Sequence, residues 1–116
     1  MTIPDHASIE AMRTCALALP HAEEGTSCVN VSFHAGGKNF LFLGRKEEYF
    51  TLRLKLGDSL KTAQELAAGK PDNYSAGSGG WTLVTFAYNA RFPKKRLQSW
   101  IEESYRLIAP KKLQQS

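Results

Sequence analysis

Apolar and polar residues alternate with two different periods along the chain, and the change of period separates predicted helices from predicted strands. Over 6–18, apolar residues recur every three or four positions, which is the spacing of one helix face. That face is formed by Ile9, Met12, Ala16 and Leu19. The polar stretch 21–28 has no such period, and we interpret it as a loop.

The period changes to two at Val31, and three strands are predicted after it. Strands over 31–35 and 38–43 are joined by Gly36-Gly37, a pair that accepts the positive φ angles of a two-residue hairpin turn. A third strand, 50–55, places Phe50, Leu52 and Leu54 on one side and Thr51, Arg53 and Lys55 on the other. This alternation is typical of a sheet with one buried face and one face open to water.

The second half of the chain contains two more predicted helices. The first covers 59–68 and begins after Asp58, which we expect to be its N-cap. A short strand near Tyr74 and a longer strand over 81–87 follow. The last helix covers 93–108, and its apolar face carries Leu97, Trp100, Ile101, Ser104, Leu107 and Ile108. The predicted order is α-β-β-β-α-β-β-α: an α+β two-layer sandwich, with helices on one face of an antiparallel sheet.

Length and composition indicate one domain over 1–116. The chain has 42% hydrophobic and 22% charged residues, as ordinary globular domains have. No apolar run approaches the roughly 18 residues of a membrane span, and charged residues interrupt the start of the chain where a signal peptide needs an apolar core. We therefore expect a cytoplasmic protein without membrane contact. Cys15 and Cys28 form no CxxC pair, and we expect both to be thiols.

Candidate catalytic and cofactor motifs are weak. The glycine-rich segment 75–80 is followed by Trp81 and a strand, not by the Lys-Ser/Thr pair that opens a phosphate-binding helix, so we interpret it as a turn. The three histidines have no metal-ligand spacing. Cys28, His21 and Glu24 come nearest to a nucleophile with its base and acid, and a solvated loop explains them better. We expect a non-enzymatic protein with no catalytic residue, cofactor or metal.

The net charge of +4 is unevenly distributed. Residues 1–30 contain one basic and four acidic residues, whereas 91–116 contain seven basic and two acidic ones. Bases that open the last helix oppose its dipole at a cost of ~0.3–1 kcal/mol each, and an anionic partner such as DNA would explain them. The candidate nucleic-acid-binding residues are Arg53, Lys55, Arg91, Lys94, Lys95, Arg96, Lys111 and Lys112. An ordinary solvated surface is the competing and more common interpretation.

Two other modes of binding stay open. The outer face of the sheet could pair with another protein, or with a second copy of the chain as a homodimer. A small molecule could bind between the glycine-rich segment and Trp81, with Tyr74 nearby. Trp100 lies on the apolar face of the last helix, and we expect it in the core.

Five segments, taken in order, carry a family resemblance. They are Glu23-Glu24-Gly25-Thr26-Ser27, Phe33, Gly36-Gly37-Lys38, Gly80-Trp81 and the closing stretch 103–112. In this order they resemble the MmcQ/YjbR family of small bacterial proteins over nearly the whole chain. The resemblance implies a compact α+β domain with a fold like frataxin (CyaY) and secretion chaperones. It also implies a family that is often labelled DNA-binding and has no firmly assigned enzymatic activity.

The chain departs from the family in one segment. Where the family usually has Ser-Trp-Gly-Asn-Pro, this chain has Ser27-Cys28-Val29-Asn30-Val31, so that Cys28 and Val31 replace the tryptophan and the proline. We therefore carry over no function from the family to this segment.

Overall fold

The structure, a computed structural model, describes residues 7–27, 30–46, 48–87 and 93–114. Its elements run in the order α1 (Ala7–Leu17), β1 (Glu23–Ser27), β2 (Asn30–Ala35), β3 (Lys38–Arg45), β4 (Tyr49–Lys55), α2 (Leu60–Gly69), β5 (Tyr74–Ala76), the 3-10 turn η1 (Ser78–Gly80), β6 (Trp81–Ala87), α3 (Lys94–Ile108) and α4 (Lys111–Gln114). No helix among the described residues is long and apolar enough to cross a membrane.

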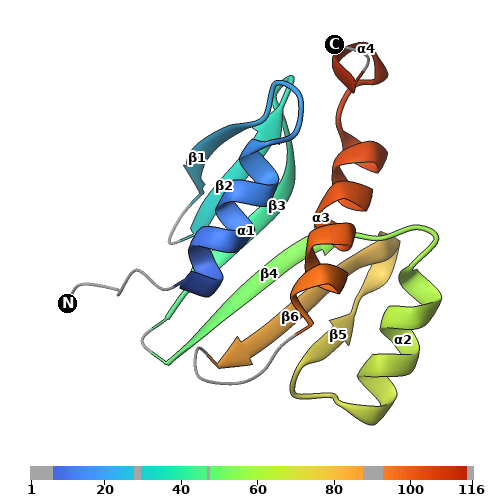
Figure 1. The fold of residues 1–116 in the computed structure, drawn as a ribbon. Coiled ribbons are helices and arrows are strands. Elements are labelled where there is room, and N and C mark those ends of the chain that lie inside the picture. The colour runs from blue at the N-terminus through green and yellow to red at the C-terminus, as the bar shows by residue number, and fades with distance from the viewer. Residues whose placement is uncertain (1–6, 28–29, 47, 88–92, 115–116) are drawn as a thin grey trace.

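The strands form one antiparallel sheet with the order β1-β2-β3-β4-β6-β5. Figure 1 shows α1 and α3 side by side over one face of this sheet, and α2 beside β5 at its end. The predicted α+β class, with helices covering one face of an antiparallel sheet, is confirmed.

The interpretation of 21–28 as a loop is wrong for most of that stretch, because Glu23–Ser27 forms the edge strand β1. The strand pairs with β2 in the register Glu24↔Phe33 and Gly25↔Ser32. This pairing uses backbone groups and needs no apolar side chain, and charged residues are common on sheet edges. A search for alternating apolar residues therefore misses such a strand.

The β2–β3 hairpin turns at Gly36 and Gly37, whose φ angles of 60° and 80° confirm the predicted turn. The register then shifts, because Phe33 pairs with Leu41 while His34 pairs with Asn39. Phe40 lies at this bulge, and both it and Leu41 are fully buried. The bulge thus adds one aromatic side chain to the core beyond what strict alternation would supply.

Strict alternation holds in β4 and β6. In β4 the residues Phe50, Leu52 and Leu54 are fully buried, and in β6 the buried residues are Thr82, Val84 and Phe86. These residues point toward the helices, and the intervening residues form the outer face of the sheet. The buried face therefore supplies most of the core, whereas the helices do not pack on the outer face.

The start of α2 differs from the predicted one. The N-cap is Ser59, not Asp58, and Ser59 makes no side-chain capping bond within its own helix. Instead the carboxylate of Glu103 in α3 accepts hydrogen bonds from the backbone N–H of Gly57 (2.8 Å), the backbone N–H of Ser59 (3.0 Å) and the Ser59 hydroxyl (2.6 Å). Burial acts to raise the pKa of Glu103, but these hydrogen bonds and the charge of Arg106 outweigh it and lower the pKa.

One face of α3 is buried as predicted, with one correction. Leu97, Trp100, Ile101 and Ser104 are buried, but Leu107 is 48% exposed, and Tyr105 occupies the buried position beside Phe40. The Ser104 hydroxyl accepts a hydrogen bond from the backbone N–H of Lys55 at 2.9 Å and donates one to the carbonyl of Phe40. One buried hydroxyl thus connects α3 to β4 and β3.

The glycine-rich segment is more ordered than a simple turn between strands. It contains most of β5 and the turn η1, with Gly79 and Gly80 at positive φ. A Cβ atom on Gly80 would lie 2.5 Å from the Leu56 carbonyl oxygen, and Leu56 N–H donates to the Gly80 carbonyl at 2.8 Å. The glycine therefore allows the close backbone approach that places Trp81 at the start of β6.

Candidate nucleic-acid interface on the outer sheet face

The face of the sheet opposite the helices carries a mixed row of side chains. The strand register places Phe42 of β3, Arg53 of β4 and Leu83 of β6 next to one another. In the same direction Ser75 of β5 lies opposite Leu83. Arg53 and Leu83 are exposed and Phe42 is half-buried, so the row presents apolar and cationic surface together.

Trp81 lies beside this row. It pairs in register with Lys55, and its half-buried ring lies with its centroid 5.6 Å from the guanidinium carbon of Arg53. The centroid of the Phe42 ring lies 6.1 Å from that of Trp81, at an interplanar angle of 51°. This is a cation–π pair flanked by a second aromatic ring. We call Phe42, Arg53, Lys55, Trp81 and Leu83 the outer-face cluster.

A depression of about 310 Å³ adjoins the outer-face cluster. It is lined by Arg53, Ser75, Gly77, Trp81, Thr82 and Leu83. Its volume is at the lower end of the range for small-molecule sites. The depression is large enough for one planar group, and Arg53, Trp81 and Ser75 are among the residues that would contact it.

The structure places the predicted basic residues in three separate regions. Arg53 and Lys55 lie on the outer face, whereas Lys94, Lys95 and Arg96 are exposed at the start of α3 in the helix layer. Lys111 and Lys112 lie in α4, beyond the other end of α3, and 15 helical residues span about 22 Å. Arg91 lies outside the described residues. Of the predicted basic residues that the structure describes, Arg53 and Lys55 are the ones brought together with aromatic side chains of the open sheet face.

Tyr74 and Trp81 do not form one small-molecule site. Tyr74 is 3% exposed, and its ring packs against Phe86 and Trp100 at centroid distances of 5.8 Å each. Its hydroxyl accepts a hydrogen bond from Arg96 at 3.4 Å. Tyr74 therefore belongs to the core under the helix layer, as Trp100 does, while Trp81 lies on the opposite face of the sheet. The expectation that they act together is wrong, but the depression beside Trp81 remains.

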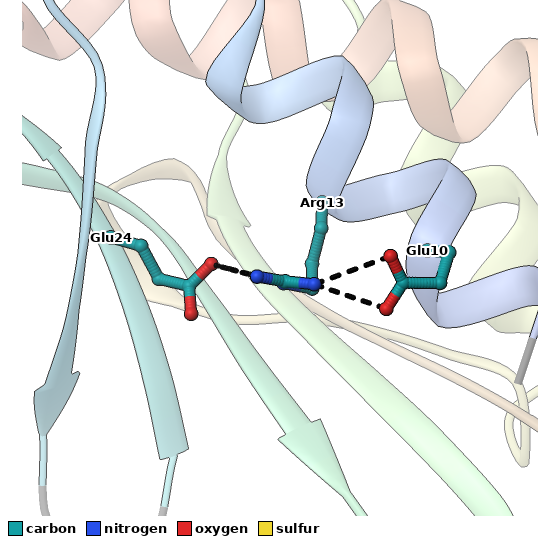
Figure 2. A network of polar contacts seen from close by, with 3 residues as sticks. All are labelled: Glu10, Arg13 and Glu24. Atoms are coloured by element: carbon teal, nitrogen blue, oxygen red, sulfur yellow. Dashed lines mark hydrogen bonds and ion pairs between the residues drawn. The ribbon is translucent and has the colours of Figure 1, made fainter. Parts of the chain in front are cut away.

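The neighbouring acids Glu23 and Glu24 also have different surroundings. Figure 2 shows Glu24 of β1 in contact with Arg13 of α1, which in turn contacts Glu10. Arg13 donates to Glu24 at 2.8 and 2.9 Å and to Glu10 at 3.0 and 3.2 Å. Glu23 lies 3.3 Å from His34 instead. The ion pair of Glu24 with Arg13 therefore connects α1 to the edge strand β1. The carboxylates of Glu23 and Glu24 do not converge on one point.

A groove of about 660 Å³ lies on the helix side, between α1 and α3. Ala11 and Cys15 are among the residues that line it, and the Cys15 thiol contacts the Gln98 carbonyl at 3.7 Å. Burial and then the charge of Glu102 raise the pKa of the Cys15 thiol, which keeps it protonated and a poor nucleophile. Cys28 lies outside the described residues. Within the described ranges no group of three or more His, Cys, Asp or Glu residues is placed to hold a metal ion.

Comparison with known proteins identifies the family. A family model for YjbR matches residues 17–107. The chain belongs to the YjbR family. Comparison with curated proteins gives no match. A crystal structure of the Deinococcus radiodurans protein DR2400, described as a DUF419 domain, resembles this chain with a TM-score of 0.68 at 19% sequence identity, over 85% of this chain and 76% of that chain. At this identity the likeness shows a shared fold.

The YjbR match contains every member of the outer-face cluster but stops before Lys111 and Lys112. Sequence reasoning selected Arg53, Lys55 and Trp81 separately and missed Phe42 and Leu83. The signal for both was available, because they alternate with the buried Leu41 and Leu43 of β3 and with Thr82 and Val84 of β6. What could not be read from the sequence is the order of the strands, which brings the five residues together.

Proposed function

We propose that this YjbR protein is a non-enzymatic binding module that contacts DNA through the outer-face cluster. The observation that carries the proposal is the Arg53 guanidinium over the Trp81 ring on a sheet face that no described helix covers. Aromatic rings on an open sheet are surfaces on which bases stack, and neighbouring cations bind phosphates. Lys55, opposite Trp81 in the register, supplies the second cation.

The other basic residues support the proposal less. Those at the start of α3 and Lys111 and Lys112 of α4 are exposed, and Arg96 at the start of α3 contacts the buried Tyr74 and not an exposed aromatic ring. Charge alone gives weak and non-specific binding to DNA. We therefore assign them at most a secondary role in attraction at long range.

The test is fluorescence anisotropy of a labelled oligonucleotide with two charge-matched double variants. Arg53→Gln/Lys55→Gln removes both cations of the outer-face cluster, and Lys111→Gln/Lys112→Gln removes the same charge from α4. We expect the first to weaken binding about tenfold or more and the second to change it less than about threefold, since each phosphate contact contributes directly to affinity. Absence of binding at about 50 μM wild-type protein in low salt, where even non-specific binding is measurable, would overturn the proposal.

A second candidate function uses the same face. Leu83 is 40% exposed and Tyr49 of β4 is 41% exposed, so a protein partner or a second copy of the chain would find apolar surface there. Light scattering separates this function from DNA binding. A homodimer that Leu83→Asp converts to a monomer supports it, and a monomer at every concentration argues against self-association.

The cytoplasmic location expected from the sequence stays a prediction, and so does the likeness to frataxin implied by the family resemblance. Fractionation of cells that produce the protein would check the first.

A further inference from the structure

Building on the proposed function, we infer that the outer-face cluster selects single-stranded over double-stranded DNA by stacking one unpaired base in the depression beside Trp81. The inference rests on three features of the face: the residues that line the depression, the small number of cations in the cluster, and the cation–π pair of Arg53 and Trp81.

The depression offers an aromatic ring and a cation to a planar ligand. It is lined by Arg53, Trp81 and Leu83 together with Ser75, Gly77 and Thr82. In a duplex each base face is covered by the next base pair, so only base edges and phosphates are reachable. An unpaired base exposes the flat surface that a half-buried indole can contact.

The charge on this face is too small for duplex binding by phosphate contacts. Arg53 and Lys55 are the cations of the cluster, whereas proteins that rely on phosphates commonly make about six to ten contacts. With two contacts to a single strand, the slope of log affinity against log salt is expected to be about −1.4, at roughly −0.7 for each contact. Eight contacts to a duplex, one for each predicted basic residue, would give a slope of about −7. Most of the affinity must therefore come from stacking.

Arg53 has a dual role in this arrangement. The guanidinium carbon lies 5.6 Å from the centroid of the indole ring, so a base that enters the depression can contact both groups. Ser75 also lines the depression, and its hydroxyl can donate to or accept from a base edge. Neither contact reads a particular base, so we expect little preference among sequences.

The experiment compares three oligonucleotides of about 12 nucleotides with the wild-type protein, by anisotropy at about 50 and 200 mM salt. They are a mixed-sequence single strand, its duplex, and an abasic strand that keeps the phosphates and lacks the bases. We expect the single strand to bind about tenfold or more tightly than either of the others, with the shallow salt slope given above. Because all three use the unaltered protein, no folding defect can mimic the result.

Variants of Trp81 then locate the stacking site. Trp81→Ala is expected to weaken single-strand binding about tenfold or more, and Trp81→Phe, which keeps an aromatic face, is expected to weaken it less than about threefold. Neither should alter the weak duplex binding, and circular dichroism checks that both variants fold.

The outcomes separate the two proposals. Duplex binding equal to or tighter than single-strand binding, or equal binding of the abasic strand, overturns the single-strand inference and leaves the proposed DNA binding standing. Absence of binding by all three oligonucleotides overturns the proposed function itself.

Discussion

The two faces of the sheet are built from alternate residues of the same strands, yet they differ in almost every physical respect. Toward the helices, Leu52 and its neighbours are fully buried. On the other side, Leu83 is 40% exposed and Arg53 lies over Trp81. Adjacent residues of β4 therefore differ completely in environment while sharing one backbone.

This difference separates stability from function. Burial of the inner face supplies the hydrophobic stabilisation, so those positions are constrained by packing. The outer-face cluster contributes little to that core. Packing of the core therefore does not explain why rings and cations occupy these positions. A surface that folding leaves unconstrained can carry residues selected for binding.

The largest expected contrast comes from one substitution made on each face. Leu52→Ala removes a fully buried side chain and should lower the free energy of unfolding by about 2–5 kcal/mol. Leu83→Ala on the outer face should lower it by less than about 1 kcal/mol. Urea denaturation measures both. Equal losses would show that the outer face is packed against something, and the comparison of the two faces would then fail.

The next contrast concerns the hydroxyl that joins the helix layer to the sheet. Ser104→Ala leaves Lys55 N–H and the Phe40 carbonyl without this buried partner and should cost about 1–3 kcal/mol. Ser75→Ala is the same change at an exposed position, and its free energy of unfolding should stay within about 0.5 kcal/mol of the wild-type value. Thermal and urea denaturation measure both variants. If Ser104→Ala leaves the free energy of unfolding unchanged, the Ser104 hydroxyl does not stabilise the contact between α3 and the sheet.

A smaller and pH-dependent effect is expected at Glu103. Its pKa is lowered below the ordinary value of 4.5, so its carboxylate adds stability above that pH and loses the contribution as the pH falls through the lowered pKa. Glu103→Gln should therefore cost about 1 kcal/mol at pH 7, after allowance for solvent screening, and this cost should shrink as the pH falls through the lowered pKa.

The exposed neighbour provides the control for this measurement. Glu102→Gln should have little effect on stability at any pH in an acid series. Urea denaturation of both variants over this series gives the comparison, and a Glu103→Gln deficit that stays constant down to the lowest pH at which the protein folds would contradict the capping role.

The smallest expected effect is a gain. Lys95 is exposed in the first turn of α3, where its charge opposes the helix dipole, so Lys95→Gln should raise stability by about 0.3–1 kcal/mol at low salt. The gain should shrink in about 0.5 M salt, because exposed charges are screened. A loss of stability would mean that Lys95 has a structural partner after all.

Elements with a strong internal period were predictable from the sequence. The strand over 81–87 coincides with β6, and the last helix begins one residue later than predicted, at Lys94. The helix–sheet packing followed from the alternation in β4. These elements were predictable because the burial of their own side chains decides their structure.

The missed features depend on groups far apart in the chain. The edge strand β1 forms through backbone pairing with β2, and the cap of α2 comes from Glu103, which lies 46 residues after Gly57. The grouping of the candidate site was missed in the same way, because the pairing of β3 with β4 and of β4 with β6 brings Phe42 and Trp81 to Arg53. The spacing of apolar residues along the chain cannot show which strands will be neighbours in the sheet.

The two tryptophans provide the most direct test of the central claim, because one lies on each side of the sheet. Trp81 is half-buried on the outer face, and Trp100 is 3% exposed beneath the helix layer. Tryptophan emission is recorded while single-stranded DNA is added to the wild type and to Trp81→Phe, with anisotropy confirming binding to both. The account predicts that emission falls on binding in the wild type and stays constant in Trp81→Phe. Equal quenching in both proteins would place the DNA on the helix side and contradict it.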